Sequence, residues 1–183
     1  MKFKYCFRSA GVIMLMTGLL ISTAAFSQNS TKDKKIIDDS KLAKKEFINA
    51  DPLMKDLFNN AYGYVIFPNI GKGGLGVGAA TGNGVVYERG AIAGMANMKQ
   101  VTVGFQAGGQ AYREVIFFET QADLNRFKEN NIEFSGQASA VAATKGASTN
   151  VKYKDGVMIF TKAKGGLMYE ASVGGQKFKF RSL

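Results

Sequence analysis

Glycine is distributed very unevenly along this chain, and its distribution limits the folds that the chain can adopt. Of the 22 glycines among 183 residues, only Gly11 and Gly18 precede Gly63. Glycines that recur among β-branched and aromatic residues are typical of short, bent strands. A segment without glycine or proline, such as residues 34–50, instead favours a helix. The sequence therefore predicts helices first and a curved sheet after them.

Helices are predicted over Lys34–Ala50, from Asp51-Pro52 to Asn59-Asn60, and between Thr120 and Ile132. The first has strong helix formers and an apolar stripe that includes Ile36, Ala43 and Phe47. In the second, Asp51 suits the N-cap and Pro52 the first helical position. Thr120 is the expected cap of the third helix.

Strands are predicted over Tyr62–Phe67, Gly74–Ala80, Val85–Arg89, Ile92–Met98, Val101–Ala107, Tyr112–Glu119, Phe134–Ala142, Gly156–Lys162, Gly166–Ser172 and Gln176–Phe180. Residues 81–84, Thr-Gly-Asn-Gly, predict a hairpin turn, and Lys154-Asp155-Gly156 predicts a second turn. Residues 135–148 also suit a buried helix, and the sequence leaves that choice open. The predicted class is α+β, with N-terminal helices packed on a Gly-rich curved antiparallel β-sheet or barrel with one inserted helix.

One face of the predicted strand Gly74–Ala80 carries almost no side chain, because Gly74, Gly76 and Gly78 alternate with larger residues. We expect close packing against a helix there in preference to contact with a ligand. Residues 71–76 also match the pattern G-x-G-x-x-G. No helix is predicted to open at its last glycine, so nucleotide binding is not expected.

The first 27 residues predict an export signal. Basic Lys2, Lys4 and Arg8 precede a short apolar stretch, and Ala25-Phe26-Ser27 places small residues at the cleavage positions. Cleavage before Gln28 would leave residues 28–33 as a flexible lead-in and residues 34–183 as one domain. The apolar stretch is too short to span a bilayer, and Cys6 precedes it, so no lipid anchor is expected. The predicted location is periplasmic or extracellular, including a position peripheral to the outer membrane.

Missing residue types exclude most enzyme classes. The chain has no His and no Trp, and Cys6 would be lost with the signal. Zinc sites built from Cys and His, thiol nucleophiles and Ser-His-Asp triads are therefore excluded, and we predict no metal and no cofactor. A carboxylate-based hydrolase stays as a lesser alternative. Its candidate groups would be Glu88, Glu114, Glu119, Glu133 and Glu170, although their spacing sets no two across a reacting bond.

Positive charge is concentrated near the C-terminus. After residue 27 the chain has 21 basic and 14 acidic residues, a balance of +7, and residues 145–183 hold eight basic and two acidic residues, or +6 of it. Three sets are spaced by two, as alternate residues on one face of a strand are: Lys152 and Lys154, Lys162 and Lys164, and Lys177, Lys179 and Arg181. If those strands pair as neighbours, the cations form a band that suits phosphate headgroups. An ordinary solvated face, with lysines that protect edge strands, is the alternative.

Separated motifs resemble the SYLF (Ysc84-type) domain family from about Asp51 to Leu183. Residues 61–68 (AYGYVIFP) with 71–74 (GKGG) are similar to its opening, 103–110 (VGFQAGGQ) with 114–118 (EVIFF) to its centre, and 160–167 (FTKAKGGL) with 172–175 (SVGG) to its close. The resemblance implies a lipid-binding module. Eukaryotic relatives engage phosphoinositides through a basic amphipathic N-terminal segment, which corresponds here only loosely to Lys34–Ala50, and a fungal branch binds actin. Export makes actin an unexpected partner.

The sequence thus predicts a non-catalytic protein that binds anionic lipid or a membrane surface and neither nucleic acid nor nucleotide. The predicted lipid-binding residues are Lys34, Lys35, Lys41, Lys44, Lys45, Lys72, Lys152, Lys154, Lys162, Lys164, Lys177, Lys179 and Arg181. A structural envelope protein that binds an acidic polymer or an acidic protein is the alternative. Whether the N-terminal helix docks on the sheet or on a membrane stays open, with the sheet preferred.

Overall fold

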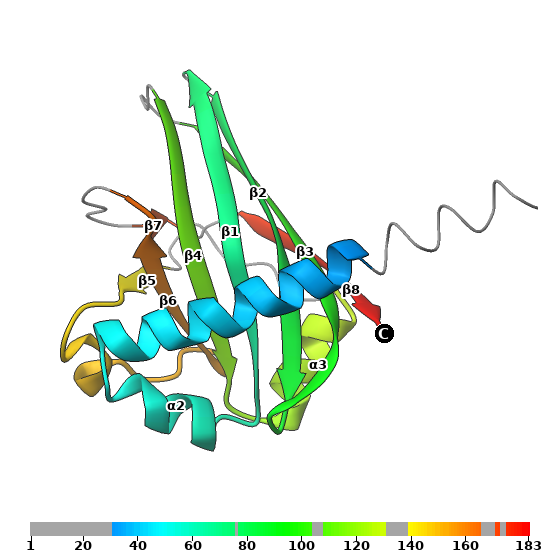
Figure 1. Ribbon diagram of the computed structural model, residues 1–183, viewed down its shortest axis with the longest axis vertical. Helices are drawn as coiled ribbons and strands as arrows, with labels where there is room; N and C mark the ends of the chain where they lie inside the picture. Colours follow the sequence, from blue (N-terminus) through cyan, green and yellow to red (C-terminus); the bar gives the residue numbers. More distant parts are fainter. Residues whose placement is uncertain (1–30, 76, 104–107, 131–138, 166–170, 173–174) are drawn as a thin grey trace, which may run out of the picture. The chain divides into compact units, whose positions relative to one another are not determined.

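The computed structural model describes residues 31–75, 77–103, 108–130, 139–165, 171–172 and 175–183. The chain divides into two compact units, with the boundary between Lys35 and Ile36. In the first unit the described residues, 31–35, are helical, including residues 31–33 of the expected lead-in. The second unit, Ile36–Leu183, contains all the other described elements (Figure 1).

Its helices are residues 36–50, α2 (Met54–Asn60), α3 (Gln121–Lys128) and the 3₁₀ turn η1 (Ala147–Asn150). Its strands are β1 (Gly63–Leu75), β2 (Val77–Glu88), β3 (Ala91–Val103), β4 (Gly108–Phe118), β5 (Ser139–Ala142), β6 (Val157–Ala163), β7 (Ala171–Ser172) and β8 (Gln176–Ser182). Several predicted strands are therefore parts of longer ones. Within residues 135–148 the described part forms β5 and the start of η1, so the helical alternative is wrong there.

The helix over residues 36–50 packs on the sheet through the predicted stripe. Ala43 and Phe47 are fully buried. Polar contacts tie the same helix to the strands: Arg113 of β4 donates to Glu46 at 2.7 Å, and the hydroxyls of Ser40 and Tyr87 lie 3.0 Å apart. Figure 1 shows this helix lying across the central strands. The preferred alternative, docking on the sheet, is confirmed.

The start of α2 differs from the prediction. Its N-cap is Leu53 and has no side-chain cap, while Asp51 lies buried before the helix. The Asp51 carboxylate accepts hydrogen bonds from the backbone N–H and the hydroxyl of Ser148, at 2.8 and 2.6 Å. These bonds, with that from the Leu53 N–H, lower the pKa of Asp51 against the opposing effect of its burial. Asp51 therefore anchors the η1 segment and does not cap the helix.

The sheet order is β7-β5-β6-β4-β1-β2-β3-β8, and all neighbours are antiparallel except β5 and β6. Among the described strands β7 and β8 lie at the two edges, so the sheet is curved but open, and the barrel alternative is wrong. Its curvature is strong. Gln176 on β8 donates to Glu114 on β4 at 3.0 Å, although three strands separate β8 from β4 in the sheet.

Residues 81–84 do not form the predicted hairpin turn, because they continue through the middle of β2. A Cβ at Gly84 would lie 2.7 Å from the carbonyl oxygen of Ile66, so close approach of β1 explains this glycine. The hairpin between β2 and β3 instead turns at Arg89 and Gly90, whose φ angles are 49° and 82°.

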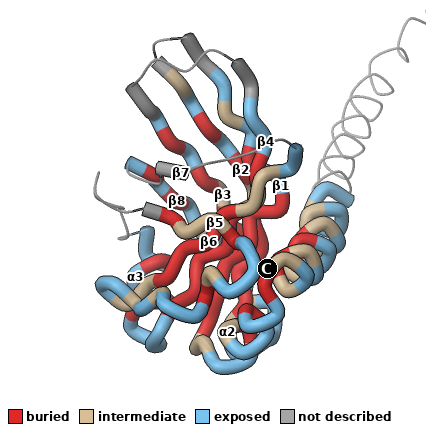
Figure 2. The backbone as a smooth tube through the Cα atoms, turned by 90° about the vertical axis from the view of Figure 1, so that its left-hand side faces the viewer, coloured by how far each residue is buried: buried red, intermediate tan, exposed pale blue. Residues whose placement is uncertain are grey.

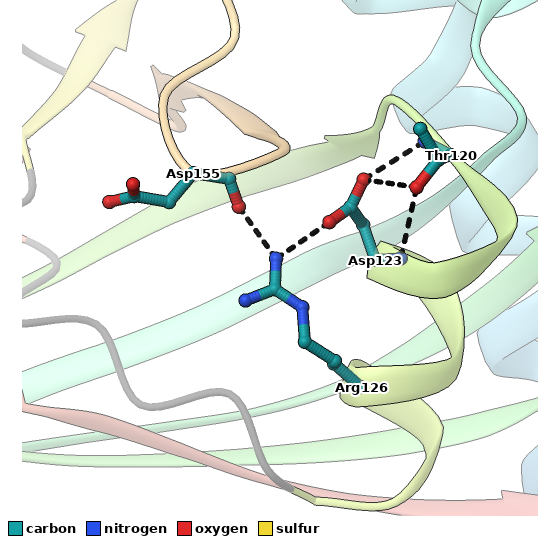
Figure 3. A network of polar contacts seen from close by, with 4 residues as sticks. All are labelled: Thr120, Asp123, Arg126 and Asp155. Carbon is teal, nitrogen blue, oxygen red and sulfur yellow. Dashed lines mark hydrogen bonds and ion pairs between the residues drawn. The ribbon is translucent and has the colours of Figure 1, made fainter.

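The other predicted turn is confirmed at Asp155 and Gly156, with φ of 51° and 77°. It is held by α3 (Figure 3). Arg126 donates to the Asp155 carbonyl at 2.7 Å and to the Asp123 carboxylate at 2.6 Å. Thr120 is the N-cap of α3, as predicted, and it forms a capping box with Asp123.

The buried residues, drawn red in Figure 2, are concentrated in the part of the sheet near its helices, and they form two apolar clusters. On the α3 side the core includes Phe118, Leu124, Phe127 and Phe178. On the opposite side, Phe47 and other residues of the N-terminal helix and α2 cover a second cluster. Burial of large side chains on both faces makes this part of the sheet the stable base from which the remaining strand ends extend.

Candidate functional site

Positive side chains gather where β3 meets the edge strand β8. Lys99 pairs directly with Lys177, and Asn97 with Lys179, in the antiparallel ladder. Side chains alternate along β8, so Phe178 is buried on one face while Lys177, Lys179 and Arg181 are exposed on the other. Lys99, Lys177, Lys179 and Arg181 form what we call the basic strip.

The Lys99–Lys177 pair sets two like charges directly opposite each other, an arrangement that destabilises a sheet. Solvent and salt weaken the repulsion because both side chains are exposed. Both ammonium groups would attract an anion placed between them. The strip is therefore suited to bind a phosphate or carboxylate group.

A hollow of about 960 Å³ lies beside the strip and is lined in part by Lys99, Val101, Lys177 and Lys179. Val101 is 68% exposed, and Phe180 adds a partly buried ring to the lining. Cationic and apolar groups thus border one open concavity. This combination fits an amphiphile with an anionic head better than a fully hydrated ion.

Amides extend the strip across the sheet. Asn69, Asn83 and Asn97 pair in register across β1, β2 and β3, and Lys179 is the next partner in the row. Asn97 donates to the Asn83 side chain at 3.1 Å, and Asn69 donates to Asp39 of the N-terminal helix at 3.2 Å. The row therefore links the basic strip to the helix that crosses the sheet.

The N-terminal helix uses some of its predicted lipid-binding lysines within the fold. Lys44 is half-buried, donates to the Tyr64 hydroxyl at 3.0 Å and lies 4.8 Å from the centre of the Phe58 ring. Burial lowers the pKa of Lys44. Lys41 forms an exposed ion pair with Asp38 at 3.2 Å. Lys45 is exposed on this helix, and Lys34 and Lys35 are exposed in the first unit.

The remaining predicted lysines do not lie on β3, the described strand that pairs with β8. Lys162 lies on β6, which four strands separate from β8, so the expected convergence of these sets on neighbouring strands is wrong. Lys164, just after β6, bonds to the Asn69 side chain. Lys152 and Lys154 are exposed at the other end of β6, and Lys72 is half-buried on β1.

Lys99 is the basic residue that sequence reasoning missed. It has no basic neighbour at a spacing of two, and only the β3–β8 register places it against Lys177. A local sequence pattern has no information on which distant strand will become a neighbour.

The carboxylates considered for a hydrolase form no facing pair among the described residues. Glu88 accepts hydrogen bonds from Lys128 at 2.6 Å and from the Tyr62 hydroxyl at 3.0 Å, and the bond from Lys128 is the main cause of its lowered pKa. Glu114 is fully buried, which raises its pKa to about 7. Glu119 is exposed, and Glu133 and Glu170 lie outside the described residues.

Across the described residues, no three His, Cys, Asp or Glu side chains gather as metal ligands. The helices in that part of the chain also include none that is both long and apolar enough to cross a bilayer.

Comparisons with known proteins point to one family. Residues 99–182 match the profile of Ysc84, described as "Las17-binding protein actin regulator". The chain is also 32% identical to beta cell expansion factor A of Aeromonas veronii over 132 residues, which are 71% of this chain and 50% of that protein. It thus spans about half the length of this curated relative. The range matched by the profile begins at Lys99 and includes Arg181, so it contains the whole basic strip.

Proposed function

Because residues 99–182 place this chain in the Ysc84 (SYLF) family, as its motifs predicted, we propose that it binds anionic lipid and catalyses no reaction. The family is one of binding domains, and other members bind actin or lipids. The profile's description refers to Las17 and actin in such members. An anionic lipid headgroup is complementary to the positive charge of this chain. Binding to such a headgroup requires no partner protein.

The basic strip is the observation that carries this proposal. It holds four exposed cations on two paired strands, next to a hollow with apolar lining. Each cation near an anionic membrane surface contributes about 1 kcal/mol of attraction. Four such residues acting together are enough for salt-dependent, reversible binding to a membrane surface.

Vesicle sedimentation of two charge-matched double variants tests the proposal. Lys177→Ala with Lys179→Ala removes two cations from the strip, and Lys152→Ala with Lys154→Ala removes two cations of the same spacing elsewhere. We expect the first pair to weaken binding to phosphatidylglycerol vesicles about 30-fold at low salt. The second pair should change it by much less.

Neutral phosphatidylcholine vesicles serve as the control, and binding to phosphatidylglycerol vesicles is also measured over a series of salt concentrations. Binding should be weak to neutral vesicles and should fall as ionic strength rises. Equal losses in the two double variants would mean that net charge and not the strip attracts the lipid. Failure to bind phosphatidylglycerol vesicles, with retained binding to soluble polyglutamate, would favour the acidic-polymer alternative.

We further propose that the protein is exported and acts at a membrane surface outside the cytoplasm. The basic, apolar and small-residue segments of residues 1–27 support this location. The N-terminal sequence of protein recovered from the periplasm or the medium should begin at Gln28. Recovery of the uncut chain in the cytoplasm would contradict the proposal.

A further inference from the structure

We propose that the protein docks on an anionic bilayer end-on. The ends of its central strands that no described helix covers, which we call the uncovered end, would enter the headgroup layer, and a ring of lysines at their base would contact the headgroups. The inference rests on the proposed lipid binding and adds the orientation of the protein and the part that enters the membrane. The strand ends are Gly73–Leu75, Val77–Ala79 and Val101–Val103. Figure 1 shows the ends of β1 and β2 extending past the helix that crosses the sheet, away from α2 and α3.

A ring of lysines lies at the base of these ends. One row of the sheet runs Lys164–Ala111–Gly71–Thr81–Lys99–Lys177, in which Lys164 joins through a backbone hydrogen bond of 3.0 Å to the Ala111 carbonyl. Lys72 lies one residue beyond that row on β1. We call Lys72, Lys99, Lys164 and Lys177 the lysine collar. Strand register, and not sequence spacing, brings these four residues to one level.

Beyond the collar the central strands contain no charged residue. None occurs between Lys72 and Glu88 or between Lys99 and Arg113. Val101, two residues beyond Lys99 on β3, is apolar and 68% exposed. The boundary between charged and uncharged sequence therefore coincides on β1 and β3, as a headgroup boundary requires.

Backbone pairing makes these ends tolerant of a less polar environment. Gly73 pairs with Ala79 on one side and Gly109 on the other, and Ala79 pairs in turn with Val101. Their peptide groups are consequently satisfied within the sheet, which lowers the free-energy penalty of leaving water. A Cβ at Gly71 or Gly73 would meet no atom of the described residues within 4 Å, so in that part of the chain nothing keeps lipid from this surface.

The length of the strand ends and the charges at the helix-covered end of the sheet both agree with shallow docking. Leu75 lies three residue steps beyond Lys72, about 10 Å along an extended strand, which is comparable to the depth that interfacial segments reach. At the other end of the same strands, Glu88 and Lys128 form an ion pair with N···O of 2.6 Å. That pair has no net charge, and Arg89 is an exposed cation in the turn beside it, whereas the collar holds four cations.

Tryptophan probes at the two ends of β3 test the orientation. The chain has no tryptophan, so Val101→Trp and Ile92→Trp each introduce a unique fluorophore at an exposed apolar position. With phosphatidylglycerol vesicles that contain brominated acyl chains, we expect the emission of the Val101→Trp variant to shift to the blue and to be quenched. The emission of the Ile92→Trp variant should not change.

Aspartate variants measure how much the strand end contributes to vesicle binding. Val101→Asp should weaken binding to phosphatidylglycerol vesicles about tenfold, because a carboxylate would have to enter the headgroup layer. Ile92→Asp should leave binding unchanged. Circular dichroism melting of each variant without lipid shows whether its fold is retained, and a poorly folded aspartate variant leaves the tryptophan result as the deciding measurement.

The outcomes separate the two proposals. If wild-type protein binds the vesicles but the Val101→Trp emission is neither shifted nor quenched, end-on docking is wrong and lipid binding stands. If the emission of the Ile92→Trp variant is quenched instead, the orientation is reversed and the inference fails. If the protein binds no anionic vesicle at all, both proposals are overturned.

Discussion

Glycines in the helix-covered part of the sheet have a different role from those at its uncovered end. At Gly94 an added Cβ would lie 2.4 Å from the Arg181 carbonyl oxygen, and at Gly84 it would lie 2.7 Å from that of Ile66. At Gly71 and Gly73 it would meet nothing within 4 Å. In the covered part glycine permits strands and rings to pack closely, whereas at the open end it leaves a flat, bare surface.

This difference extends to the polar groups. In the covered part Glu88 accepts from Lys128 and Tyr62, and Glu114 is fully buried beside Gln176. At the open end Lys99 and Lys177 are exposed with their like charges opposed. The covered part thus pairs or buries its charged groups, whereas the open end sets like charges opposite each other on neighbouring strands.

The largest expected effect concerns Glu114, the buried acid of the covered part. Its folded pKa of about 7 lies above the ordinary value of 4.5, so the folded state holds this proton more tightly. The stability contributed by this group is complete below pH 4.5 and falls as the pH rises to about 7. Between pH 4 and pH 8, Glu114→Gln should gain on the order of 3 kcal/mol of unfolding free energy relative to wild type. Urea denaturation at both pH values measures this change.

The result is read from the difference in unfolding free energy between wild type and Glu114→Gln. Asp51, Glu88 and Asp123 have lowered pKa values, so their protonation in acid destabilises both proteins alike. A difference that stays constant with pH would show that Glu114 is ionised normally.

A pair of alanine variants addresses the glycine contrast directly. Gly94→Ala should destabilise the protein by about 2 kcal/mol, because backbone atoms of β8 must move to admit the methyl group. Gly73→Ala should change the unfolding free energy by less than about 0.5 kcal/mol, since the added methyl group meets open space. Chemical denaturation measures the unfolding free energy of both variants. Equal losses would show that the glycines of the two regions do not differ in role.

The smallest expected effect is at the basic strip. Lys99→Gln removes one member of the like-charged pair and should stabilise the protein by about 0.5 kcal/mol at low salt. The gain should disappear in 1 M salt, where the Debye length is about 3 Å. Lys45→Gln, at an exposed lysine of the N-terminal helix, provides the control. A gain that persists at high salt would show that repulsion is not its cause.

Local signals in the sequence were sufficient for several elements. The apolar stripe of Lys34–Ala50, the Thr120 cap and the turn at Asp155-Gly156 all depend on neighbouring residues, and all are present. The hairpin predicted at residues 81–84 was wrong, because glycines that permit turns also permit close packing. Which role a glycine has depends on the strand that lies beside it.

By itself the sequence determined the α+β class, the family resemblance, the concentration of positive charge near the C-terminus and the exclusion of chemistry that needs His. Tertiary structure alone decided that Lys99 faces Lys177, that β6 and β8 lie far apart in the sheet, and that uncharged strand ends emerge at one level above a collar. The physical reason is that helices, caps and turns form through contacts a few residues apart. Strand order and register instead join residues from distant parts of the chain, and the surface charge pattern follows from that pairing.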